Sequence, residues 1–261
     1  MLFIHEDNLK NKIKTDYKGK GKIIQKFYDD EYLKMRDKLL NLKFKKNNMD
    51  IFEIFAKEAT SYYNKLIKFS SANSITSQSK FESTYLEELS VYLFSNLDEI
   101  KNGKYGVFNK KVYAGLKIDK DDNIVIIPKD VDFCIGKKVN IKIDEQHETE
   151  LIIPIVAVEV KTYLDATMFG EVKSSSRSIR SASPNSKTYL LMGWKAIADE
   201  HIIAARQDSF LSEIYVLKKD ENSEFDAKTI YEYWCDITSA IKSVNEEIEI
   251  KTPGKLLFPN K

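Results

Sequence analysis

Residues 150–165 read ELIIPIVAVEVKTYLD, and this stretch joins an apolar run to two charged residues at its end. Nine of the eleven residues from Leu151 to Lys161 are apolar, which is typical of a strand in the middle of a covered sheet. Because side chains alternate along a strand, Ala157, Glu159 and Lys161 share one face, and the valines between them occupy the other. The pattern therefore predicts a buried strand that ends in an acid and a base on the same side.

A second acid is expected from PKDVDFCIG, residues 128–136, where Asp132 and Cys134 share a strand face. If the two strands pair, Asp132, Glu159 and Lys161 meet at one edge of the sheet. Two carboxylates held together are costly to bury without a cation, and oxygen ligands suit Mg²⁺. Two alternatives remain open. Asp130 is the second choice for the first acid, since it follows a proline at the strand start, and a plain ion pair with Lys161 would leave the same pattern.

The rest of the chain predicts an α/β fold. Apolar residues spaced by three and four indicate helices within residues 22–69 and a third helix at about 80–97. Strand-like runs follow from 105 to 161, then a helix at about 166–181, a strand at TYLLMGW, a helix to about 206, a strand at EIYVL and a closing helix. This order predicts a mixed sheet flanked by helices. We expect a helical N-terminal region, 1–75, packed on a core domain, 76–261.

Composition excludes several classes of protein. The chain has 261 residues, 43% of them hydrophobic, and a net charge of +1, so neither a membrane span nor a strongly basic nucleic-acid surface is indicated. Cys134 and Cys235 lie in apolar segments and are expected to be reduced core residues of an intracellular protein. The three histidines lack metal-ligand spacing, and no glycine-rich phosphate loop is present.

The combination of Asp132 with Glu159-Val160-Lys161 resembles the signature of the PD-(D/E)XK nuclease superfamily. The longer run VAVEVKTYLDATM, residues 156–168, and the helix STYLEELSVYLF, residues 83–94, resemble type II restriction endonucleases of the BbvCI kind. The resemblance implies a restriction-endonuclease-like core that hydrolyses phosphodiester bonds of double-stranded DNA at a short specific sequence. It also implies that Asp132, Glu159 and the carbonyl of Val160 bind Mg²⁺, while Lys161 handles the attacking water.

Such nucleases often add an acid from the core helix, and three glutamates compete for that role. The resemblance points to the pair Glu87 and Glu88, whereas a helical projection puts Glu82 in the middle of the apolar face, Glu88 at its edge and Glu87 on the solvated side. Glu88 satisfies both arguments and is the preferred candidate. An ordinary surface glutamate is the alternative.

The helix after the catalytic strand carries Lys173, Arg177 and Arg180 on one side among serines, so these three are the candidate DNA-binding residues. A solvated helix face is the alternative. We further expect a homodimer or a related second subunit. The helical region 22–69, with the tyrosines Tyr28, Tyr32, Tyr62 and Tyr63 expected to be exposed, is the candidate to carry that interface or to embrace the DNA. The expected location is the cytoplasm of a prokaryotic cell. A repair or recombination nuclease and a non-catalytic DNA-binding subunit are the competing functions.

Overall fold

The structure, a computed structural model, describes residues 2–142, 148–205 and 210–244. Its centre is a five-stranded sheet in the order β1-β4-β5-β6-β7. The strands are β1 (Gly106–Phe108), β4 (Phe133–Lys142), β5 (Glu148–Leu164), β6 (Lys187–Lys195) and β7 (Glu213–Val216). β1, β4 and β5 are antiparallel, while β5, β6 and β7 run parallel, so the predicted mixed sheet is confirmed.

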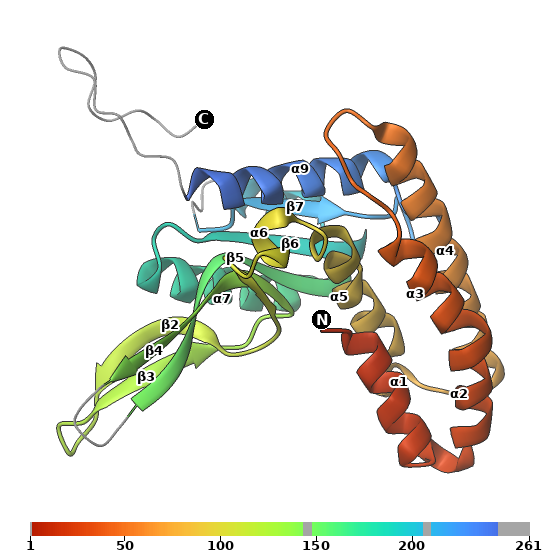
Figure 1. The fold of residues 1–261 in the computed structure, drawn as a ribbon, viewed down its shortest axis with the longest axis horizontal. Coiled ribbons are helices and arrows are strands. Elements are labelled where there is room, and N and C mark those ends of the chain that lie inside the picture. The colour runs from red at the N-terminus through yellow and green to blue at the C-terminus, as the bar shows by residue number, and fades with distance from the viewer. Residues whose placement is uncertain (1, 143–147, 206–209, 245–261) are drawn as a thin grey trace.

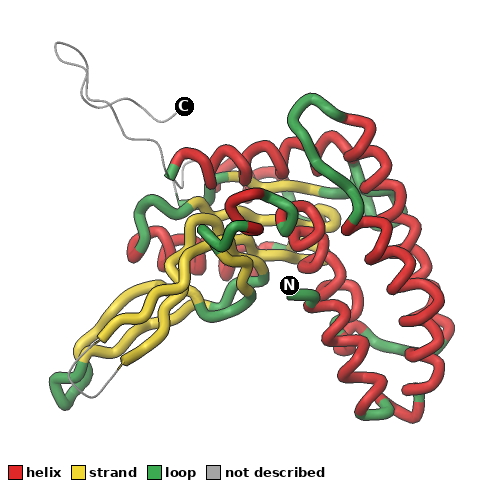
Figure 2. Tube along the Cα trace, viewed as in Figure 1, coloured by secondary structure: helices red, strands yellow, loops and turns green. Residues whose placement is uncertain are grey.

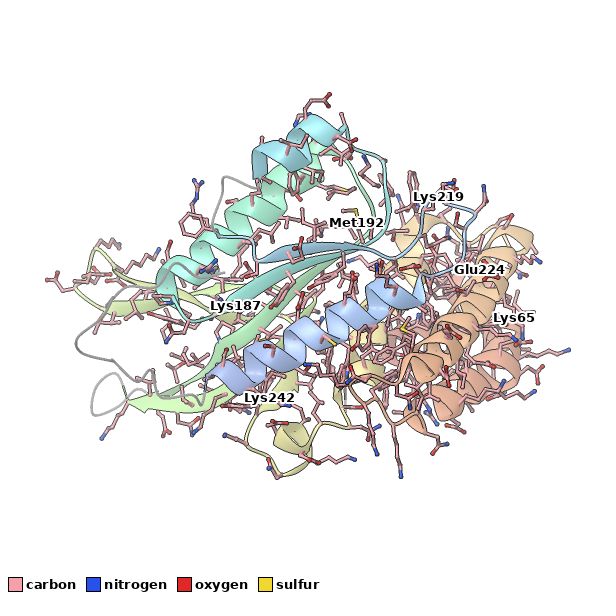
Figure 3. All side chains as sticks on the ribbon, turned by 90° about the horizontal axis from the view of Figure 1, so that it is seen from above. Lys65, Lys187, Met192, Lys219, Glu224 and Lys242 are labelled. Carbon is pink, nitrogen blue, oxygen red and sulfur yellow. The ribbon has the colours of Figure 1, made fainter. Side chains whose placement is uncertain are left out.

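Helices cover both faces of this sheet. Val158 and Val160 of β5 belong to a core shared with α5 (Phe81–Phe94) and α9 (Ala227–Ser243). On the opposite face, Leu190 and Met192 of β6 pack against α7 (Ala166–Ala182). Figure 3 shows α7 and α9 on opposite sides of β6, whose Lys187 and Met192 are labelled. Two short helices, α6 (Asp98–Lys101) and α8 (Asp199–Ala205), complete this part.

Local sequence explains where these elements begin and bend. Asp165 and Asp226 cap α7 and α9 by accepting hydrogen bonds from the backbone N–H groups of Met168 and Thr229, at 2.8 and 2.7 Å. Pro154 has no N–H to give to the sheet, and the β4–β5 register shifts next to its partner Gly136. A Cβ at Gly136 would meet the carbonyl oxygen of Ile153, so a side chain cannot occupy this bulge.

The N-terminal region is helical, as predicted, and it shares one core with the sheet. It contains α1 (Ile4–Lys14), α2 (Gly21–Phe27), a π-helical turn (Tyr28–Tyr32), α3 (Leu33–Leu40) and α4 (Met49–Ala72), with 3₁₀ turns at Tyr17–Gly19 and Ser77–Ser79. Figure 2 shows these helices gathered at one end of the sheet. Their buried side chains join those of α5 and α9 in a single cluster. The boundary at residue 75 therefore stays a prediction.

The expectation of exposed tyrosines in this region is wrong. Tyr28, Tyr32, Tyr62 and Tyr63 are only 0–8% exposed. The N-terminal helices pack on each other and on α5, so side chains that an isolated amphipathic helix would expose are covered by a neighbouring helix. These tyrosines cannot supply an interface.

A β arm extends away from the helices, at the lower left of Figure 1. It consists of β2 (Val112–Ile118) and β3 (Ile124–Lys129), a separate antiparallel pair, together with the outer parts of β4 and β5. The apolar run at 105–118 is broken between β1 and β2, where Lys110 has a positive φ of 71°. Among the residues described, no helix has the length and hydropathy needed to cross a bilayer.

Candidate active site

The β4–β5 pairing brings Asp132, Glu159 and Lys161 together. Phe133 pairs with Val158, and just before it the backbone N–H of Asp132 donates to the carbonyl of Val158 at 3.2 Å. The Asp132 carboxylate accepts a 2.7 Å hydrogen bond from the backbone N–H of Val160, which fixes it beside β5. The ammonium of Lys161 lies 3.6 Å from the Glu159 carboxylate. The predicted acid, acid and base therefore form one cluster.

The two carboxylates perturb each other. Burial, the negative charge of Asp132 and a hydrogen bond to its side chain raise the pKa of Glu159 to about 7, while the Lys161 ammonium acts in the opposite direction. Two adjacent acids that resist joint ionisation are suited to a hard divalent cation, which stabilises both charged forms. No group of three or more His, Cys, Asp or Glu side chains with metal-binding geometry occurs within the described ranges. The oxygen ligands that would suit Mg²⁺ are these two carboxylates and the backbone carbonyl of Val160, whose role as a ligand is a prediction from the sequence.

Asp130 is placed differently from Asp132. It is exposed and accepts a 3.3 Å hydrogen bond from the backbone N–H of Lys111. Its carboxylate lines the groove described below, but the contact with the backbone of β5 belongs to Asp132. The geometry favours Asp132 as the first acid.

Glu87 is the glutamate of α5 whose charge interacts with those of this cluster. Burial raises its pKa to about 8, and the next cause is the charge of Asp132; the ammonium groups of Lys80, Lys161 and Lys110 lower it. A solvated position was expected for Glu87, and this expectation is wrong, because α5 is covered on most sides and Glu87 is half-buried, with its charge interacting with those of Asp132 and Lys161. The only sequence signal for it was the resemblance, which pointed to the pair of neighbouring glutamates.

The preferred candidate, Glu88, lies elsewhere. Its carboxylate is fully buried and accepts hydrogen bonds from the backbone N–H groups of His5 and Glu6, at 2.8 and 3.1 Å, and from the hydroxyls of Tyr32 and Tyr92. It therefore caps the first turn of α1 instead of joining the cluster. The helical projection failed here because α1 supplies backbone donors that sequence spacing cannot reveal. Glu82 is also apart, 3.4 Å from the hydroxyl of Tyr63.

A groove of about 890 Å³ opens beside the cluster. Glu159 and Lys161 line it from β5, Gly170 and Ser174 from α7, and Lys129 from the end of β3. Lysines on two elements face a channel whose lining from α7 is small or polar. Lys111 adds a third lysine, and Asp130 and Glu171 add two acids, so the lining carries three ammonium groups and three carboxylates.

The three candidate DNA-binding residues lie on one side of α7, next to the groove and not in its lining. The ammonium of Lys173 is 5.2 Å from the ring centre of Phe169, and the guanidinium of Arg177 is 5.3 Å from that of Phe210. Arg180 lies one turn further along the helix and is half-buried. A role in DNA binding remains a prediction for all three.

Comparison with known proteins agrees with this architecture. The model of the Bpu10I restriction endonuclease family matches residues 78–239, more than half of the chain. Among solved structures, a chain of "native BbvCI A2B2 tetramer at low resolution" matches with a TM-score of 0.77 at 13% sequence identity, over 95% of this chain and 100% of that one. No curated protein sequence matches. The resemblance to type II restriction endonucleases is confirmed.

Proposed function

We propose that this chain is catalytic and depends on Mg²⁺. The chain belongs to the Bpu10I restriction endonuclease family, and it is a type II restriction endonuclease or a subunit of one. The observation that carries the proposal is the hydrogen bond from Val160 to Asp132, which holds one carboxylate against the strand that supplies Glu159 and Lys161. Two partly buried acids in contact are costly without a cation beside them, so their pairing favours a metal site.

Asp132, Glu159 and the carbonyl of Val160 would hold the ion. When bound, Mg²⁺ supplies positive charge to the phosphate and acidifies water beside it. Lys161, in contact with Glu159, orients the attacking water and favours its hydroxide form through its own charge. Glu87 completes the acidic surroundings, and we assign it the supporting role on α5 that Glu88 cannot play.

The substrate is double-stranded DNA with a short specific sequence. Lys111 and Lys129 at the groove contact phosphates next to the cleaved bond, and Lys173, Arg177 and Arg180 on α7 contact phosphates further along the duplex. Phosphate contacts of this kind set the position of the protein and make affinity fall as salt rises.

A partner subunit is part of the proposal. The BbvCI chain with the same fold belongs to an A2B2 tetramer, that is, an assembly of two kinds of chain. One cluster of this kind serves one DNA strand, so a double-strand break requires a homodimer or a related second subunit. The cell compartment that fits such a protein is the cytoplasm of a prokaryote.

The decisive experiment is a plasmid digest with the purified chain, with Mg²⁺ and with EDTA, followed by sequencing of the ends. Discrete products or a nick at one sequence support the proposal. A smear or trimming from ends would indicate a repair nuclease. No cleavage with Mg²⁺, alone or with a related subunit present, would indicate a non-catalytic DNA-binding subunit.

A further inference from the structure

A second cavity, of about 260 Å³, lies where β5 and β6 end against α4 and α5. Its lining is unusually aromatic, with Tyr63, Phe81, Tyr163 and Trp194. Hydroxyl and carboxyl groups complete the wall, among them those of Ser70, Ser83 and Glu82. None of these residues belongs to the catalytic cluster.

Two of the aromatic rings stack on each other at the mouth of this cavity. Tyr163 and Trp194 face each other in the β5–β6 register, with ring centres 5.5 Å apart and planes inclined by 27°. Tyr163 is nevertheless 40% exposed, one of few large apolar side chains left open outside the β arm. A stacked ring with an open face favours a flat ligand.

The polar lining is only partly satisfied by hydrogen bonds among the described residues. Ser70 is only 7% exposed, and its hydroxyl has no hydrogen-bond partner among the described residues. The half-buried Glu82 carboxylate accepts a long hydrogen bond of 3.4 Å from the hydroxyl of Tyr63, and the Lys218 ammonium adds a favourable charge interaction. Buried polar groups without partners are costly, and a ligand that supplies a donor and an acceptor here would satisfy them.

The cavity lies directly beside the candidate active site. Tyr163 follows Lys161 by two residues, about 6.6 Å along a strand. Ser83 precedes Glu87 by four residues, about one helical turn on the same side of α5. Residues of both β5 and α5 therefore line the cavity one short step from the catalytic cluster. This step is comparable to the distance between neighbouring nucleotides in a DNA strand.

We propose that this cavity receives one nucleobase of the bound DNA, turned out of the stack beside the cleaved phosphate, with its face on Tyr163 and its edge toward Glu82 and Ser70. This inference rests on the proposed function only for the presence of DNA. An acceptor carboxylate at the edge selects bases with an exocyclic amino group, so adenine, cytosine and guanine bind better than thymine.

The test uses Trp194 as its own reporter. The Trp234→Phe substitution leaves Trp194 as the single tryptophan, and it breaks no hydrogen bond of a described residue because the indole N–H of Trp234 has no partner there. This protein is titrated at low salt with single-stranded homopolymers of about twelve nucleotides, dA, dC and dT. We expect saturable quenching of the Trp194 fluorescence with dA and dC and weaker quenching with dT.

Variants then assign the quenching to the cavity. Tyr163→Ala, at an exposed side chain whose loss does not threaten folding, lowers the affinity for dA roughly tenfold, whereas Tyr163→Phe keeps the stacking face and the affinity. Ile203→Ala, which truncates a side chain of α8 that is 60% exposed, is the control and has no effect. Glu82→Gln reduces the preference for dA and dC over dT.

No saturable quenching with any homopolymer, or equal quenching with Tyr163→Ala, overturns the proposal. The readout does not depend on cleavage. Quenching with these dependences in a chain that does not cut DNA would therefore leave the cavity assigned and the nuclease activity rejected. Cleavage without such quenching would support the nuclease activity and reject the assignment of the cavity.

Discussion

At the scale of single residues, Asp130 and Asp132 form a natural comparison, because two acids two positions apart lie next to the same groove. Asp132 is held by the backbone of β5, whereas Asp130 is exposed and bonded only to Lys111. We predict that Asp132→Asn removes Mg²⁺-dependent cleavage and that Asp130→Asn keeps most of it. Initial rates of plasmid cleavage measure both. An essential Asp130 would mean that the metal site must be redrawn around the end of β3.

Lys161 contacts the Glu159 carboxylate and is one of three lysines in the groove lining, so its main contribution should be to the chemical step. We predict that Lys161→Ala abolishes cleavage while DNA affinity stays within a few-fold, because one lysine among several accounts for little of the phosphate binding. Single-turnover cleavage and binding in Ca²⁺ measure the two effects separately. Lys129→Ala, at another lysine of the groove, is the control and should weaken binding more than cleavage. Parallel loss of both in Lys161→Ala would contradict the assigned role.

At the scale of elements, two neighbouring glutamates of α5 lie in different environments. Glu87 faces the cluster, and Glu88 caps α1. We predict that Glu87→Gln lowers the cleavage rate at least tenfold with unchanged stability, whereas Glu88→Gln lowers the free energy of unfolding by about 1–3 kcal/mol, because an amide nitrogen then faces backbone or hydroxyl donors. Urea unfolding and cleavage rates should give opposite rankings. Equal stability of the two variants would remove the capping role of Glu88.

The contact between α1 and α5 also predicts a pH dependence. Burial lowers the pKa of His5 to about 3, since its ring lies among Tyr62, Thr84 and Tyr85. The backbone N–H of His5 donates to the Glu88 carboxylate. The folded state thus binds fewer protons at His5 than the unfolded state, in which the pKa is near 6.5. Stability from this group is complete above pH 6.5 and is lost as pH falls, by up to about 1.4 kcal/mol per pH unit.

His5→Asn isolates this effect, because Glu88 and the other buried groups remain in both proteins. The free energy of unfolding of the wild type, measured against that of the variant between pH 4 and 8, should rise up to pH 6.5 and then level off. A difference that does not change with pH would show that the imidazole is charged or accessible in the folded protein.

At the scale of the whole molecule, the parts that sequence predicted are those determined by local pattern. The apolar run of β5, its alternation and its pairing with the strand that begins directly after Asp132 depend on nearby residues, and these appear as expected. The errors share a different cause. Glu87, Glu88 and the tyrosines of the N-terminal helices were misplaced because α1 and α4 close over α5 from far away in the chain. Amphipathic projection assumes one covered face, and α5 is covered on nearly all sides.

The last prediction concerns the number of sites. Each chain offers one cluster of Asp132, Glu159 and Lys161, and the BbvCI chain with this fold belongs to an A2B2 tetramer. We therefore expect the isolated chain to nick one strand of its site, or to cut both strands only slowly, and the related subunit to restore linear product. Sedimentation and a time course on supercoiled plasmid measure assembly and cleavage together, with Asp132→Asn as the inactive control. A nicked circle that persists fits one active cluster per site. Prompt conversion to linear DNA by a stable homodimer would show that two copies of this chain suffice.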